Sequence, residues 1–137
     1  MSPRTTFLSR LLGLYFLLAA LCLAVHGRGA ADAASAFVQS PPAMLLGGAL
    51  LLLAGLALVL SHNVWSGGSR AVAVTLIGWL TLIKGAGLLL FPAETVARFY
   101  LVSLRYDRHY GLVLVFSFVV GVWLTYGGFS SRARPPA

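Results

Sequence analysis

Four long stretches of apolar residues alternate with shorter polar stretches along the chain. The apolar stretches cover residues 8–26, 43–61, 71–91 and 111–129. Each is close to the roughly 20 residues that a helix needs to cross the hydrocarbon core of a bilayer. Because backbone groups in lipid must be hydrogen-bonded within their own segment, we expect four transmembrane helices. The predicted fold class is an all-α membrane protein, a four-transmembrane-helix bundle forming a single domain over residues 1–137.

Two of the connections, residues 27–42 and 92–110, are longer than the third. Pro92 opens the second of them, and proline suits the first turn of a helix. Glu94 follows near the positive end of that helix, where a carboxylate is stabilising. We therefore expect a short helix in each long connection, lying in the membrane interface with aromatic residues such as Tyr100 at headgroup depth.

The order of helix, short interfacial segment and helix occurs twice, with an offset of about 65 residues. This offset aligns Gly13 with Gly78, Leu17 with Leu82, and Leu23 with Leu88. The pattern predicts two helical hairpins related as a parallel pseudo-repeat, with an axis along the membrane normal. It differs from the inverted repeat that is common in secondary transporters.

Composition supports the membrane assignment, and the membrane assignment in turn explains the positive net charge. The chain is 59% hydrophobic and 9% charged, whereas soluble domains are about 25% charged. Its net charge of +7 comes mostly from arginines that flank the apolar stretches, where they determine topology and contact lipid headgroups. We therefore expect the lipid bilayer as a partner and no nucleic acid.

The distribution of arginines predicts the orientation. The side with both termini carries five and the other side carries four: Arg4, Arg10, Arg70, Arg132 and Arg134 against Arg28, Arg98, Arg105 and Arg108. The positive-inside rule then places both termini in the cytoplasm. The expected location is the bacterial inner (plasma) membrane, in a multi-pass protein. The first apolar stretch also has features of a signal peptide, and we expect it to be retained as a helix.

Lys84 is the one charged residue in the stretch 71–91. A lysine at mid-helix costs about 2.5–3.5 kcal/mol on insertion scales, and less if its side chain snorkels. One hypothesis makes Lys84, with Thr81 about 60° away around the helix, a site for an anion, a lipid phosphate or a partner's carboxylate. The other makes it a snorkelling lysine that meets Glu94, Asp107 or helix-end carbonyls.

Small residues recur at positions where helices could approach each other closely. Such residues are typical of helix contacts in membranes, because they let backbones come near one another. We expect the second, third and fourth helices to pack through Gly48, Gly55, Gly78, Gly85, Ser117, Gly121 and Thr125.

A polar segment follows the second helix. Its first residues can cap the carbonyl end of that helix, and a tryptophan there can anchor at the interface. The stretches HNVW at 62–65 and IGWLTLIKG at 77–85 resemble a family of small bacterial integral membrane proteins with four helices. The resemblance implies this architecture and no particular activity. It links His62, Asn63, Trp65, Trp79 and Lys84, although His62 and Lys84 are expected at different depths.

No arrangement typical of catalysis or metal binding is present in the sequence. The three histidines and the single cysteine have no paired ligand spacing, and neither a catalytic triad nor a phosphate-binding loop is recognisable. We therefore expect no metal, no cofactor and no enzymatic activity.

Three functions remain open at this point. The first is a non-enzymatic protein that acts by helix–helix association, as an accessory subunit of a membrane complex or as a homo-oligomer. The second is a transport or channel component that binds an anion or a lipid headgroup at Lys84. The third is a membrane enzyme at the outer face that uses His26, His109, Glu94 and Asp107.

Overall fold

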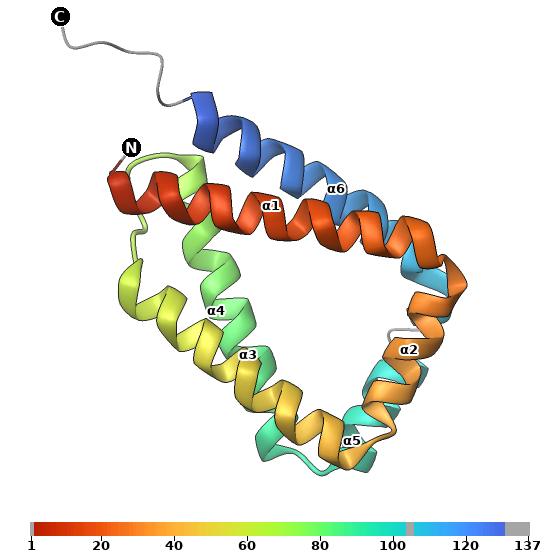
Figure 1. Cartoon of the computed structure of the whole chain (residues 1–137). Coiled ribbons are helices and arrows are strands. Elements are labelled where there is room, and N and C mark those ends of the chain that lie inside the picture. The colour runs from red at the N-terminus through yellow and green to blue at the C-terminus, as the bar shows by residue number, and fades with distance from the viewer. Residues whose placement is uncertain (1, 104–105, 131–137) are drawn as a thin grey trace, which may run out of the picture.

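The computed structural model describes residues 2–103 and 106–130, except for the side chains of residues 103 and 106–108. The described chain is helical: α1 (Pro3–His26), α2 (Arg28–Val38), α3 (Pro41–Ser61), α4 (Ser69–Leu90), α5 (Ala93–Arg98), the π-helical segment η1 (Phe99–Ser103) and α6 (Tyr106–Ser130) (Figure 1). Four helices are long and apolar enough to cross a membrane: α1, α3, α4 and His109–Ser130 of α6. The predicted all-α fold with four spans is confirmed.

The helices begin earlier than the apolar stretches from which we predicted them. α1 begins at Pro3, where the Ser2 side chain accepts a hydrogen bond from the Thr5 amide at 3.2 Å. α3 begins at Pro41, again with proline in its first turn. Hydropathy locates the lipid-facing part of a helix, whereas polar caps and prolines set where it begins, so each observed helix begins before its predicted range.

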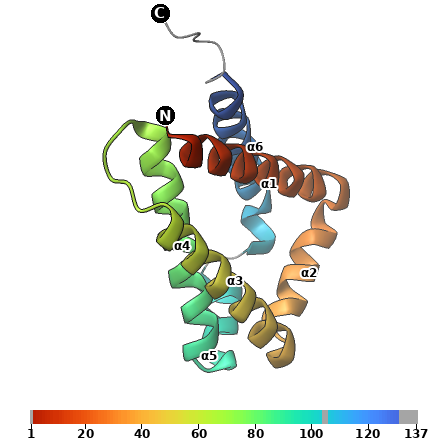
Figure 2. The ribbon, with the colours of Figure 1, turned by 60° about the vertical axis from the view of Figure 1, so that its left-hand side comes forward.

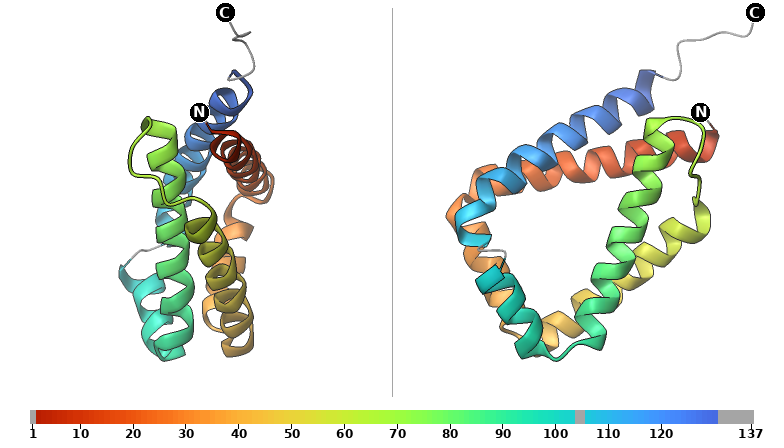
Figure 3. Two further views of the ribbon diagram at one scale, coloured as in Figure 1. Left: turned by 90° about the vertical axis from the view of Figure 1, so that its left-hand side faces the viewer. Right: turned by 180° about the vertical axis from the view of Figure 1, so that it is seen from behind.

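The long helices form two antiparallel pairs, α3 with α4 and α1 with α6. We call the end where α1 begins and α6 ends the termini end. The two pairs meet there through α1 and α4 and diverge toward the opposite end, where α2 and α5 lie between them. The outline is a triangle whose sides are α1/α6, α3/α4 and α2/α5 (Figures 1 and 2). The same arrangement is visible from behind (Figure 3).

Because the number of candidate spans is even, α1 starts and α6 stops on the same side of the protein. Arg4, Arg10 and Arg70 lie at this termini end. Arg105, Arg132 and Arg134 lie outside the described residues, as does the side chain of Arg108.

Each pair is held by helix backbones that approach closely. Gly55 of α3 lies against the backbone of Leu82, and Gly85 of α4 lies against the backbone of Leu52. In the other pair, Gly121 of α6 lies against Leu17. A side chain at any of these glycines would meet the neighbouring helix, so their small size permits the contact.

Two separate apolar clusters join these elements. One lies at the termini end, connects α1, α4 and α6, and contains Leu8, Leu12, Val74 and Leu124. The other lies at the far end, connects α2 to α5, and contains Val38, Met44, Leu88 and Val96. Leu124 and Val74 are 0% and 1% exposed, so the termini end is tightly packed where the two pairs meet.

The two halves of the chain have matching elements. Adding 65 to the residue numbers of α2 (28–38) gives 93–103, the combined bounds of α5 and η1. The same addition carries α1 onto α4 and α3 onto α6. The predicted hairpin repeat is thus present in the order of elements, but packing pairs helices across the halves, so that α1 contacts α6 and α3 contacts α4.

The contacts repeat along with the elements. Gly121 lies against Leu17, and Gly55 lies against Leu82; Leu17 and Leu82 are 65 apart, and the glycines are 66 apart. Equivalent polar contacts also occur. Thr5 of α1 bonds His62 at the end of α3, and 65 residues later Arg70 of α4 bonds Gly127 of α6. The two halves of the chain, offset by 65 residues, are therefore related by an approximate two-fold axis.

We expect Gly55→Ala to destabilise the protein, although alanine is a better helix former by about 1 kcal/mol. Its methyl group would collide with the Leu82 backbone, and overpacking of this kind costs about 1–3 kcal/mol. Gly87→Ala is the matched control, because a methyl group there meets nothing within 4 Å. Thermal unfolding in detergent should show a lower Tm for Gly55→Ala alone. An unchanged Tm would contradict the close contact.

Candidate functional site

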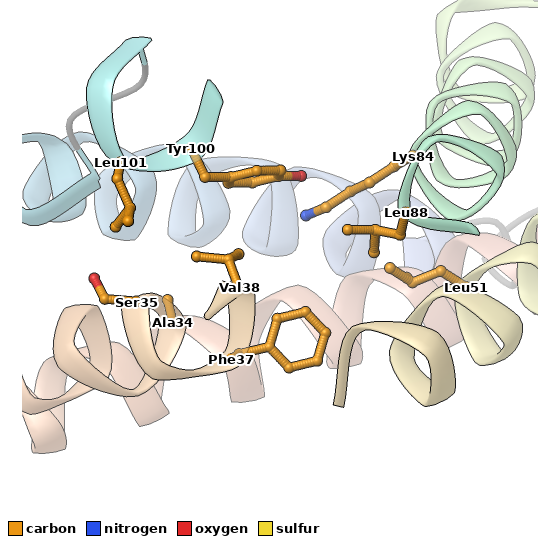
Figure 4. A pocket seen from close by; sticks show the side chains of 9 residues that line it. All are labelled: Ala34, Ser35, Phe37, Val38, Leu51, Lys84, Leu88, Tyr100 and Leu101. Carbon is orange, nitrogen blue, oxygen red and sulfur yellow. The ribbon is translucent and has the colours of Figure 1, made fainter. Parts of the chain in front are cut away.

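Lys84 projects from α4 into a cavity at the far end of the molecule. The residue lies six positions before Leu90, the last residue of α4, which corresponds to about 9 Å along the helix axis. The cavity has a volume of about 140 Å³ and lies between α2, η1 and the α3/α4 pair; its lining residues are Ala34, Ser35, Phe37, Val38, Leu51, Lys84, Leu88, Tyr100 and Leu101 (Figure 4).

The partner of the Lys84 ammonium is an aromatic ring. Its Nζ atom lies 5.7 Å from the centroid of the Tyr100 ring, a distance typical of a cation–π contact. Burial raises the pKa of the Tyr100 hydroxyl above its usual value, so this ring stays neutral at physiological pH. Figure 4 shows the two side chains converging over Val38 and Leu88. The ammonium therefore faces a mostly apolar surface.

No carboxylate among the described side chains forms an ion pair with Lys84. Glu94, which we considered as a partner, is exposed on α5 and does not pair with it. The side chain of Asp107, the other acid considered, lies outside the described residues. Lys84 thus reaches the cavity with no carboxylate paired to it among the described side chains.

A second polar cluster lies at the termini end, about the segment that follows α3. His62 is 3% exposed, and its Nε2 atom lies 3.0 Å from the Thr5 hydroxyl of α1. Its Nδ1 atom is buried without a hydrogen-bond partner among the described residues. Asn63 Oδ1 accepts hydrogen bonds from the indole nitrogens of Trp65 at 2.8 Å and Trp79 at 3.5 Å. The segment therefore ties α1, α3 and α4 together.

Four of the five residues linked by the sequence pattern, His62, Asn63, Trp65 and Trp79, meet in this cluster. Lys84 lies apart from them in the far cavity, at a different depth along the helices. Thr81 lies between the two regions, and its hydroxyl donates to the Ile77 carbonyl at 2.7 Å within α4. The first four residues therefore form a structural cluster at the termini end, and Lys84 is a separate cation at the far end.

The residues predicted to pack helices lie at two interfaces. Gly48, Gly55, Gly78 and Gly85 face the partner helix within the α3/α4 pair. Gly121 and Thr125 of α6 face α1, where Thr125 lies against Gly13. Ser117 of α6 is buried.

Sequence reasoning missed two of the polar residues that link helices at the termini end, Thr75 and Arg10. Thr75 is fully buried; its hydroxyl accepts from the Val64 amide at 3.0 Å and has the Val64 carbonyl at 2.9 Å. Arg10 Nε donates to the Gly128 carbonyl at 2.8 Å, near the end of α6. From sequence, Arg10 is expected only as a charge that flanks the first apolar stretch. Cations are favoured at helix C-termini, which was an available signal. The sequence does not show, however, which helix ends near Arg10.

An apolar groove separates α1 from α3. Its volume is about 580 Å³, and its lining residues are Leu8, Leu11, Leu12, Tyr15, Phe16, Leu50, Leu51, Ala54, Ala57, Leu58, Ser61, Ile77 and Thr81. Leu51 lines both this groove and the Lys84 cavity. The two spaces are therefore adjacent between the diverging helix pairs.

The chemistry available at these sites is binding through one cation and an apolar surface. Among the described residues, no group of three or more His, Cys, Asp or Glu side chains is placed to hold a metal ion. His26 Nδ1 lies 3.0 Å from the Cys22 carbonyl of its own helix, so this contact is local to α1.

Comparisons of the chain with protein-family models, curated protein sequences and solved structures found no significant match. The stretches HNVW and IGWLTLIKG therefore identify no family. The chain is a four-helix protein with four candidate membrane spans.

We expect Thr75→Val to loosen the segment between α3 and α4 with little change in side-chain shape. The Val64 amide would lose its acceptor in a part-buried hydrogen bond, and an intramolecular hydrogen bond typically contributes about 0.5–1.5 kcal/mol. Amide hydrogen exchange at Val64 should accelerate by about 5-fold or more. Thr81→Val is the control, because its hydroxyl bonds only within α4. Unchanged exchange at Val64 would show that Thr75 does not hold the segment.

Proposed function

We propose that this membrane protein is a non-enzymatic binding protein that holds an anionic group on the Lys84 ammonium. The observation that carries the proposal is the position of the lysine, which is exposed, lines an open cavity and forms no ion pair with a carboxylate among the described side chains. Lys84 is also the only lysine in the chain. Its side chain keeps accessible surface, which a ligand needs in order to reach the ammonium.

Energetics support an anionic ligand. A lysine costs about 2.5–3.5 kcal/mol at the centre of a span and less toward its end, where Lys84 lies six residues before Leu90. A cation–π contact returns about 0.5–2 kcal/mol, so the Tyr100 ring offsets part of the cost of Lys84. A phosphate or carboxylate on Nζ would supply a charge-assisted hydrogen bond, which is stronger than a neutral one.

Lys84 has no equivalent lysine in the other half of the repeat. The residue 65 positions before Lys84 is Ala19, on the equivalent helix of the other half. The interhelical contacts recur in both halves, whereas the lysine occurs in one. Its presence is therefore not required by the contacts that build each pair, which supports a role in binding.

Action by association, as an accessory subunit or a homo-oligomer, is the alternative that we first favoured from the small-residue faces. Those glycines already contact helices of the same chain: Gly55 lies against Leu82, and Gly121 lies against Leu17. An association with other subunits would have to use other surfaces. This lowers its support relative to anion binding at Lys84.

The single lysine allows a direct test. Protein labelled with ¹⁵N-lysine in nanodiscs has one labelled side-chain nitrogen, the Nζ of Lys84. Titration with butyl phosphate should shift that resonance in a saturable manner. Arg98→Met is the charge-matched control, because it removes an exposed cation from α5, and it should leave the titration unchanged.

Native mass spectrometry provides a second readout that does not need the lysine signal. Lys84→Met should lower the retained anionic ligand by about 10-fold, which corresponds to about 1.4 kcal/mol, and Lys84→Arg should largely preserve it. The proposal falls if butyl phosphate leaves the Nζ resonance unmoved, or if Lys84→Met retains as much anionic ligand as Arg98→Met.

A further inference from the structure

We infer that the ligand is an anionic amphiphile, with its headgroup on Lys84 and its hydrocarbon chain in the groove between α1 and α3. This inference rests on the proposed function and specifies the ligand class. A small anion would need only Lys84, whereas an amphiphile would also use the apolar groove of about 580 Å³. That volume is within the range of about 300–1,000 Å³ typical of small-molecule sites.

The groove and the cation are adjacent. Leu51 of α3 lines both the Lys84 cavity and the groove. On α4, Thr81 lines the groove and lies three residues before Lys84, which places the two on neighbouring parts of one helix face. A molecule with its charged end at Lys84 therefore has the groove directly beside it, in the direction of the termini end.

The groove suits a hydrocarbon chain. Its lining is aliphatic or aromatic apart from the hydroxyls of Tyr15, Ser61 and Thr81. Ser61 and Thr81 donate to helix carbonyls, at 3.2 Å to Leu58 and 2.7 Å to Ile77. These two donors are already used, so the surface presents little that would bind a polar occupant.

The groove is also open to the surroundings of the helices. Tyr15 and Leu50 on its two sides are 63% and 60% exposed. Both lie within candidate membrane spans, so a chain could enter sideways from the bilayer without leaving hydrocarbon. Charge complementarity at Lys84 and continuity with this lateral opening together favour an amphiphile over a soluble anion.

A bulky substitution in the groove tests the inference separately from the cation. Ala54→Trp places a large ring among the lining residues, at a position that is exposed in the structure. Leu53→Trp is the control: this neighbour is 65% exposed and does not line the groove. Both variants keep Lys84, so the ¹⁵N resonance of its Nζ atom reports binding in each.

The probes are butyl phosphate and dodecyl phosphate, titrated into each variant in nanodiscs. We expect Ala54→Trp to weaken dodecyl phosphate binding by about 10-fold and to leave butyl phosphate binding unchanged. Leu53→Trp should change neither. Equal dodecyl phosphate binding by Ala54→Trp and Leu53→Trp would overturn the groove assignment while leaving anion binding intact.

Two further outcomes would also overturn the inference. If butyl phosphate fails to move the wild-type Nζ resonance, anion binding itself fails and the amphiphile with it. If native mass spectrometry finds a protein partner that Ala54→Trp displaces, the groove holds a partner helix instead of a lipid chain.

Discussion

The close approach of helix backbones within each pair is the contact on which the rest of the structure depends. Lipid is as apolar as leucine, so burial of apolar side chains does not drive helices together in a membrane. Gly55 against Leu82 and Gly121 against Leu17 supply close packing instead. Because each pair is joined tightly along its own length, the two pairs need to meet at only one end. The divergence at the other end leaves space for α2, α5 and the cavities between them.

The sequence was sufficient to predict the number and approximate position of the long helices, because long apolar stretches have few alternatives in lipid. It also indicated the short helices and the repeat, through Pro92 and the 65-residue offset. It could not predict which helices pair. Gly13, Gly55 and Gly121 look alike as small residues, and nothing in their spacing says that α1 packs against α6.

The candidate site was predictable only in part, for a related reason. Lys84 was recognisable because a charge in an apolar stretch is costly, but its neighbour depends on tertiary structure. Proximity in sequence favoured Glu94, whereas the fold places the Tyr100 ring beside the ammonium. Thr75 is even less visible from sequence, because one hydroxyl in a helix looks the same whether it faces lipid or accepts from the amide of a neighbouring segment.

The approximate two-fold relation between the halves has a consequence for the lateral surfaces of the protein. Two identical half-chains could form the same frame as a homodimer, and every side chain would then occur twice. In one polypeptide, equivalent positions of the two halves can carry different residues, as Ala19 and Lys84 do. The shape of the protein stays nearly symmetric while its electrostatics do not. Of its two lateral flanks, one therefore differs in charge from the other, and molecules diffusing in the plane of the bilayer meet two unlike faces.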